Sequence, residues 1–250
     1  IARLAVEGYF AMPRDRRRSL AGEALEMARR IDDPVALVAA LASSLLVCWS
    51  HDNLETRLSM DDELVAVAAM NAIPYAELIG RHFRMVDHLE AGDRAAADAD
   101  FAACVQLSER LGHHAFHVQL AWYRAMLAFV DGRIADAEEL VDAAFETNVA
   151  SNEQAAWMAY GAQMYRLRRE QGRHAELEEI LRFTADHQPQ VAVALRTGLA
   201  TTAAEHGRID EAREMIDALL TNDEYDDGND LLAPLYAVQL AEAAVAIGHD

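Results

Sequence analysis

The stretch AMLAFVDGRIADAEELVDAAFE, residues 125–146, decides the fold of this 250-residue chain. An apolar segment runs up to Asp131, Gly132 follows, and the next segment places apolar side chains at i, i+3, i+4, i+7 and i+8. A glycine that can take positive φ is typical of a helix C-terminus, and this spacing is typical of a helix with one buried face. The stretch therefore predicts two helices joined by a tight turn at Gly132.

Three other segments repeat this pattern around Gly92, Gly172 and Gly207, and a further copy begins at Gly248. Successive glycines are 40, 40, 35 and 41 residues apart, which is the period of a solenoid built from helix pairs. No segment alternates apolar and polar residues as a half-buried strand does. We predict an all-α fold, a right-handed α-solenoid of roughly five to six degenerate helix pairs.

The two helices of each pair differ in character. Segment 114–131 is apolar on every face and must be covered on both sides, whereas the segment after Gly132 carries acidic residues on one face. We therefore expect an inner layer of apolar helices and an outer layer of acidic helices. Nearer the N-terminus, the same reasoning predicts an outer helix at 15–31, an inner helix at 34–50 and an outer helix at 53–71.

Charge separates along with these layers. The outer segments carry 26 acidic and 5 basic residues, and the inner segments carry 7 acidic and 10 basic residues. The outer segments counted are 52–72, 92–113, 134–151, 174–189 and 209–229, and the inner ones are 34–51, 73–91, 114–133, 152–173 and 190–208. We expect a strongly negative outer surface and a neutral to positive inner lining.

Composition excludes several classes of function. A net charge of −20 disfavours direct contact with nucleic acid or with an anionic membrane. All 22 basic residues are arginine, so neither a Schiff-base lysine nor a phosphate-loop lysine is present. Cys48 and Cys104 have neither disulfide-framework nor metal-ligand spacing, and we interpret them as buried free thiols. No apolar stretch is long enough to span a bilayer. We expect a cytoplasmic protein.

The short motifs that could bind a metal or act in catalysis are incomplete. His113 and His117 share one helix face, but no carboxylate completes a zinc site, and we interpret them as residues that cap or solvate a helix start. The acidic run 223–230 lacks the closing Glu of a calcium loop and is interpreted as a solvated loop. Asp61–Glu63 are interpreted as charges on an outer face, facing solvent. We predict no catalytic residue, no metal and no cofactor.

The repeats also resemble the tetratricopeptide family, which places a small residue seven positions before the turn glycine and an Ala five positions after it. Ala125, Ala200 and Ala241 match the first position, and Ala97, Ala137 and Ala212 match the second. Met85 and Tyr165 replace the small residue, and Leu177 replaces the later Ala. The repeats are therefore degenerate.

Three stretches resemble the C-terminal helical-repeat region of large bacterial signal-transduction ATPases. They are ALEMARRIDDPVALVAAL (24–41), LRREQGRHAELEEIL (167–181) and TTAAEHGRIDEAREMI (201–216). The resemblance implies that residues 1–250 form one repeat domain cut from a longer protein. It also implies that neighbouring ATPase and output domains, the latter for DNA binding or cyclic-nucleotide synthesis, lie outside this segment.

In the tetratricopeptide family, inner helices line the groove that holds a ligand. The resemblance transfers this role to His82, Gln119, Trp122, Met126, Phe129, Arg166, Arg169, Thr197 and Thr201. Arg166 and Arg169 beside Trp122 could clamp a carboxylate or a phosphate. An equally open alternative is that these arginines pair with acidic residues of neighbouring helices.

The expected function is a non-catalytic sensor or interaction module of a bacterial signalling or transcriptional regulator. Its groove would bind a protein or peptide partner or a small anionic effector. The alternative is a structural scaffold for domain packing or self-association, with no groove ligand. Apolar surface at both ends of the segment would favour self-association.

Overall fold

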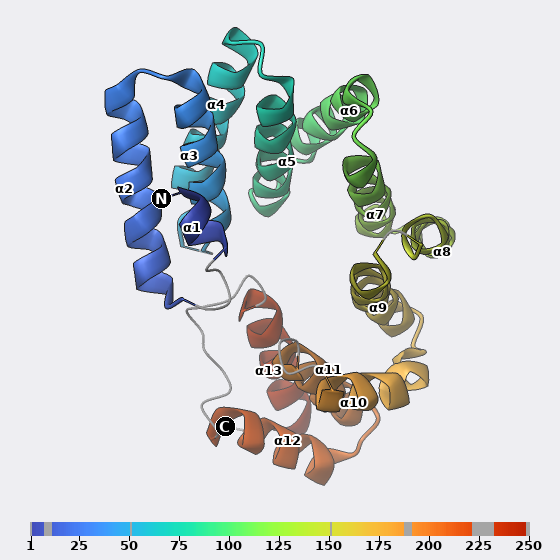
Figure 1. Cartoon of the computed structure of the whole chain (residues 1–250). Helices are drawn as coiled ribbons and strands as arrows, with labels where there is room; N and C mark the ends of the chain where they lie inside the picture. The colour runs from blue at the N-terminus through green and yellow to red at the C-terminus, as the bar shows by residue number, and fades with distance from the viewer. Residues whose placement is uncertain are drawn as a thin grey trace. The chain divides into compact units, whose positions relative to one another are not determined.

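The computed structural model describes residues 2–7, 12–50, 52–150, 152–187, 192–221 and 233–248 (Figure 1). In these ranges the chain forms thirteen α-helices and one 3-10 helix, and they contain no strand. The prediction of an all-α fold is confirmed. The acidic run 223–230 lies outside the described residues.

The chain divides into two compact units, residues 1–120 (unit 1) and 121–250 (unit 2). Unit 1 contains α1 (Ala2–Glu7), α2 (Arg14–Ile31), α3 (Pro34–Val47), α4 (Leu54–Met70), α5 (Pro74–Glu90), α6 (Arg94–Leu111) and the first part of α7 (His114–Val130). From α1 to α6 each helix packs on the next one along the chain, and α3 also packs on α5. The predicted helices at 15–31, 34–50 and 53–71 are present as α2, α3 and α4.

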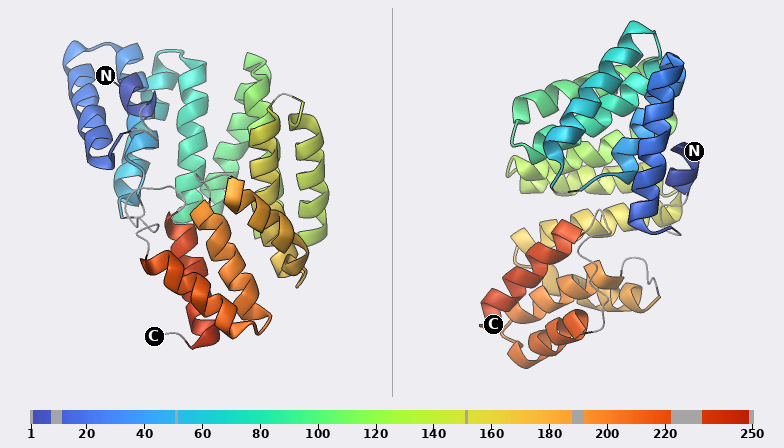
Figure 2. Two further views of the ribbon diagram at one scale, coloured as in Figure 1. Left: turned by 60° about the horizontal axis from the view of Figure 1, so that its bottom comes forward. Right: turned by 90° about the vertical axis from the view of Figure 1, so that its left-hand side faces the viewer.

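Unit 2 contains the rest of α7, α8 (Ile134–Asn148), α9 (Glu153–Glu170), the 3-10 helix η1 (His174–Leu177), α10 (Glu178–His187), α11 (Ala192–Glu205), α12 (Ile209–Thr221) and α13 (Ala233–Ile247). Helix α8 packs on α9, and α11 packs on α10, α12 and α13. Figure 2 shows the helices of each unit from two further directions. In both units, therefore, helices contact their neighbours in sequence, and some also contact the next helix but one.

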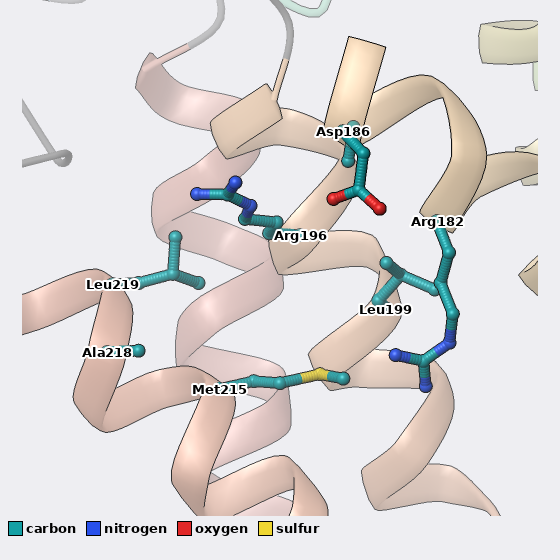
Figure 3. Close-up of a pocket in the computed structure, with 8 residues that line it drawn as sticks. Arg182, Asp186, Arg196, Leu199, Met215, Ala218 and Leu219 are labelled. Carbon is teal, nitrogen blue, oxygen red and sulfur yellow. The ribbon is translucent and has the colours of Figure 1, made fainter. Parts of the chain in front are cut away.

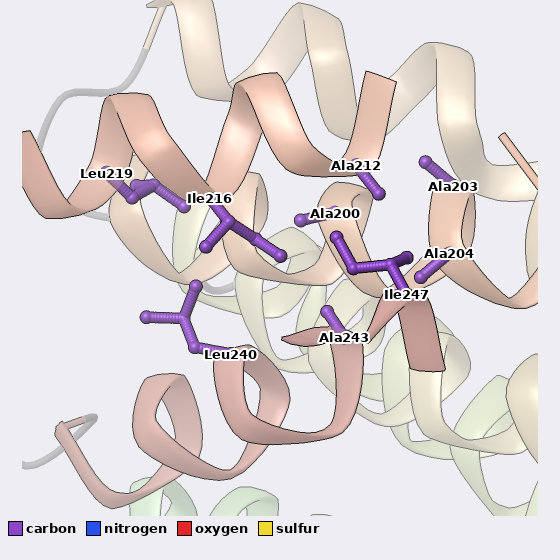
Figure 4. Close-up of a cluster of buried hydrophobic side chains, with 9 residues drawn as sticks. All are labelled: Ala200, Ala203, Ala204, Ala212, Ile216, Leu219, Leu240, Ala243 and Ile247. Carbon is purple, nitrogen blue, oxygen red and sulfur yellow. The ribbon is translucent and has the colours of Figure 1, made fainter. Parts of the chain in front are cut away.

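The core between α11, α12 and α13 is formed by small and medium apolar side chains (Figure 4). Its members are Ala200, Ala203, Ala204, Ala212, Ile216, Leu219, Leu240, Ala243 and Ile247. Five of these nine residues are alanines, which lets helix backbones approach closely because little side chain separates them. Ala200 and Ala212 occupy the small positions that the repeat pattern predicted, and both are completely buried.

The predicted turn glycines end their helices in the left-handed conformation. The φ angles of Gly92, Gly132, Gly172, Gly207 and Gly248 lie between 62° and 76°. After each of the first four, the next N–H bonds to a carbonyl five residues earlier, as Arg133 does to Ala128 at 3.0 Å. This is the Schellman arrangement, which satisfies carbonyls that the helix end leaves free. The predicted turns are confirmed.

A second series of left-handed turns lies between the helix pairs and was not predicted. Asp32, Ala72 and Gly112 have φ angles of 56°, 53° and 61°, and they are spaced 40 residues apart. Ala72 and Gly112 have the same hydrogen bonds as the first series, because Ile73 N–H bonds to Ala68 and His113 N–H bonds to Ser108. Left-handed turns with this spacing therefore extend further toward the N-terminus than the glycines alone indicate.

The Tyr at a small-residue position is accommodated by a glycine on a neighbouring helix. Tyr165 is buried, and its hydroxyl donates a 3.0 Å hydrogen bond to the carbonyl of Gly198 on α11. A Cβ atom at Gly198 would lie 3.3 Å from the Tyr165 ring. A large residue on α9 is thus matched by the absence of a side chain on α11.

Candidate functional site

Two of the predicted groove residues contact each other in unit 1. The side-chain nitrogen Nε2 of Gln119 lies 3.1 Å from Nε2 of His82. The His82 ring also packs edge-on against Phe83 and Phe116. Burial lowers the pKa of His82 to about 4, so at neutral pH its Nε2 can accept a hydrogen bond from the Gln119 amide. Both side chains have partners inside unit 1.

In unit 2, the predicted residues of α7 lie at the edge of the core. Trp122 is half-buried and packs on a cluster that includes Val141 and Met164. The Trp122 carbonyl accepts a 3.1 Å hydrogen bond from Gln163 of α9, so α7 and α9 meet at this level. Met126, one turn further along α7, is also half-buried.

Arg169 forms ion pairs with two other helices. Its guanidinium lies 2.6 Å from Glu205 of α11 and 2.7 Å from Glu242 of α13. Arg169 therefore links α9, α11 and α13, and its charge is compensated inside unit 2. For this residue the geometry agrees with internal pairing, although the partners lie on predicted inner helices rather than outer ones.

Arg166 differs from Arg169, although it lies only one turn away on α9. It is half-buried, and no carboxylate among the described residues forms an ion pair with it. Eight other arginines each lie within 4.0 Å of two carboxylates: Arg57, Arg81, Arg84, Arg133, Arg168, Arg169, Arg182 and Arg208. In a chain with an excess of carboxylates, Arg166 keeps an uncompensated charge within the described part of unit 2.

Thr197 and Thr201 face α13 rather than an open surface. Both are buried, and the Thr197 hydroxyl lies 2.6 Å from the side-chain oxygen of Gln239. The Thr201 hydroxyl donates a 3.1 Å hydrogen bond to the Gln239 carbonyl. In this arrangement the two hydroxyls hold α13 against α11 and are closed to a ligand.

A buried ionic cluster in unit 1 was missed by the sequence analysis. Asp61 was predicted to face solvent, which is wrong, because it is 0% exposed and lies between Arg57 and Leu64 on the inward face of α4. Burial, together with the neighbouring Asp87, raises the pKa of Asp61 to about 9, so this carboxyl is protonated at neutral pH. Its position one turn before the buried Leu64 and Val65 was the available signal.

Arg57 compensates the remaining charge of this cluster. Its guanidinium forms ion pairs with Asp87 and with Glu90, the latter at 2.6 Å, and it lies 4.7 Å from the centre of the Trp49 ring. Two carboxyl groups with different protonation could in principle act as acid and base. Because Asp61 and Asp87 are enclosed, however, no substrate can reach them in this conformation.

A pocket of about 280 Å³ lies among α10, α11 and α12 (Figure 3). Its lining includes the charged residues Arg182, Asp186 and Arg196 and the apolar residues Leu199, Met215 and Leu219. The Arg182 guanidinium already forms ion pairs with Glu178 and Glu211. No predicted groove residue lines this pocket. A ligand in it would mainly contact its apolar wall.

The histidines and cysteines noted in the sequence have local structural roles in the described residues. His113 caps α7, because its Nδ1 accepts a 3.3 Å hydrogen bond from the Phe116 N–H. Cys48 and Cys104 form no disulfide; Cys104 is buried as predicted, whereas the prediction of burial is wrong for Cys48, which is half-buried. Within the described ranges, no three potential ligands gather in a way that could hold a metal ion.

Comparisons with known proteins add no assignment. The chain matches no family model and no curated protein. In the part of the chain that is described, no helix combines the length and the apolar character needed to cross a bilayer.

Proposed function

We propose that the chain is a non-catalytic interaction module, a right-handed solenoid of roughly five to six tetratricopeptide-like helix pairs. The packing of helices on their sequence neighbours and the two series of left-handed turns support this proposal. Its binding surface is the face of α9 around Arg166, and its ligand carries carboxylate or phosphate groups.

The observation that carries this proposal is the contrast between Arg166 and Arg169. A guanidinium that is partly desolvated loses hydration, and charged hydrogen bonds from a ligand would restore it. Arg169 has two such partners within unit 2, whereas Arg166 has none among the described residues.

On this proposal, the module senses an anionic effector or an acidic peptide within a larger signalling or transcriptional regulator. Binding at α9 would bias neighbouring ATPase or output domains. The resemblance of residues 24–41, 167–181 and 201–216 to the helical-repeat region of signal-transduction ATPases supports this context.

The second candidate is a structural scaffold without a groove ligand. The internal contacts of Arg169, Thr197 and Thr201 favour it, because these three predicted groove residues already bond to side chains or carbonyls of α11 and α13. Substitution of Arg166 distinguishes the interaction module from the scaffold.

The test uses a fluorescently labelled acidic peptide of Glu, Leu and Ala and two variants. Arg166→Gln should weaken binding roughly tenfold to a hundredfold, the equivalent of about 1.5–3 kcal/mol for a hydrogen bond to a charged group. Its Tm should stay unchanged because it has no described partner. Arg169→Gln is the matched control, and it should lower Tm. A lower Tm for Arg166→Gln with unchanged affinity would favour the scaffold.

A further inference from the structure

An exposed aromatic cluster lies on α8 and α9. The centre of the Phe145 ring on α8 lies 4.5 Å from that of Trp157 and 4.8 Å from that of Tyr160, both on α9. The Trp157 and Tyr160 ring centres are 5.9 Å apart. Trp157 is 53% exposed, and its neighbour Met158 is 45% exposed. We call Phe145, Trp157, Met158 and Tyr160 the aromatic patch.

Packing explains only part of this patch. Tyr160 packs against the core of unit 2, and Phe145 is half-buried between the two helices. Trp157 leaves about half of its surface in water, although a tryptophan is among the side chains that gain most from burial. Exposed apolar surface that contains Trp and Tyr is typical of a protein interface.

The segment that carries the aromatic patch has acidic charges only. Residues 134–165 contain six acidic residues and no Arg, Lys or His. Asp142 accepts a 3.2 Å hydrogen bond from the Tyr160 hydroxyl. Glu146 lies one turn after Asp142, Glu153 lies one turn before Trp157, and all three carboxylates are exposed. None of them forms an ion pair with a described residue.

From these contacts and charges we infer that the aromatic patch is a docking surface for a cationic segment of another protein. The segment carries Arg or Lys beside an apolar anchor. Guanidinium groups stack on the faces of Trp and Tyr, and the three carboxylates pair with them at the rim. The apolar anchor covers Met158 and the open face of Trp157. This partner has the opposite charge to the ligand proposed at Arg166, so the two sites can be separated.

The probe is a short acetylated peptide of Arg, Leu and Ala, added to protein labelled with 5-fluorotryptophan. The chain has three tryptophans, and the ¹⁹F signal of Trp157 should shift while those of Trp49 and Trp122 stay in place. Trp157→Ala should weaken binding about tenfold or more, as loss of a central aromatic contact does. Phe183→Ala is the matched control, because Phe183 is 59% exposed on α10, and it should bind normally.

A second variant keeps the aromatic rings and removes the charge. Asp142→Asn, Glu146→Gln and Glu153→Gln together should weaken binding and flatten its dependence on salt. Arg166→Gln should bind the basic peptide normally, even if the function proposed at that residue fails.

Three results would overturn the inference. The basic peptide could bind the wild-type chain and the charge-neutral variant equally well. The acidic peptide used for Arg166 could shift the Trp157 signal to the same extent as the basic peptide. Sedimentation could show that Trp157→Ala abolishes self-association while the basic peptide does not bind, and the occupant would then be a second copy of the chain.

Discussion

Units 1 and 2 bury different kinds of polar side chain. The buried carboxyl groups of the described residues, Asp61, Asp87 and Asp100, all lie in unit 1 together with the buried Arg57. In unit 2, the buried hydrogen bonds between α11 and α13 are made by hydroxyl and amide groups, those of Thr197, Thr201 and Gln239. Charged groups respond to pH, and they lose more stability on the removal of a partner than neutral groups do. The comparison teaches that two all-helical units of one chain can differ in how their stability depends on pH.

The largest effect is expected from breaking the ion pairs of unit 1. Arg57→Met should destabilise the chain by about 3–5 kcal/mol, because it leaves Asp87 buried without its cation. Urea unfolding followed by circular dichroism measures this loss. Hydrogen exchange should place it in α4 and α5. If the cost is below about 1 kcal/mol, the cluster contributes little and the contrast between the units is lost.

The second prediction concerns the pH dependence of stability, which should differ between the two units. Since the folded-state pKa of Asp61 is raised to about 9 from its usual value of 3.8, its contribution to stability is fully present below pH 3.8. It is progressively lost as pH rises toward 9. Asp61→Asn mimics the protonated carboxyl at every pH. It should therefore match the wild type near pH 4 and exceed it at pH 8 by about 1 kcal/mol or more, a Tm rise of roughly 2–4 °C.

The control for this series lies in unit 2. Thr197→Val removes the hydroxyl that lies near Gln239, and it should cost about 1–3 kcal/mol because the amide oxygen loses its partner. Since neither group titrates, the cost should be the same at pH 4 and pH 8. Calorimetry on both variants across that range measures the two trends. Parallel pH trends for Asp61→Asn and the wild type would contradict the assignment of a buried proton to unit 1.

The smallest effect concerns the left-handed turns. In unit 2 the residues with positive φ are all glycines within the described ranges, whereas unit 1 has Asp32 and Ala72 in this conformation. A Cβ in the left-handed region costs roughly 1–2 kcal/mol, partly offset by the greater freedom of glycine in the unfolded chain. Ala72→Gly should therefore stabilise by up to about 1 kcal/mol, and Gly132→Ala should destabilise by a similar amount. Chemical denaturation measures both, and a destabilising Ala72→Gly would show that the turn is unstrained.

Much of the local structure could be predicted from the sequence. The turn glycines, the helix that begins at Pro34, and the small buried positions Ala97 and Ala137 depend on backbone conformation and on helical periodicity. These are short-range properties, so they can be recognised within a window of residues. The turn at Ala72 was missed because alanine carries no signal for positive φ.

The candidate site could be predicted only in part. The tetratricopeptide resemblance selected Arg166 and Arg169 together, and one turn of helix separates them. Glu205 and Glu242, which bond to Arg169, lie 36 and 73 residues away in sequence, and nothing in the local pattern pairs them. The same holds for Thr197 and Gln239, whose contact spans 42 residues.

The sequence by itself determined the all-helical fold, the period of the turns and the excess of negative charge, because each is a property of single residues or of neighbours along one helix. Only the tertiary structure decided which charges are compensated. Whether Asp61 keeps its proton, and whether Arg166 rather than Arg169 remains open to a partner, depends on which distant side chains lie within a few ångströms. Burial and Coulomb interactions act over that distance in space and not along the chain.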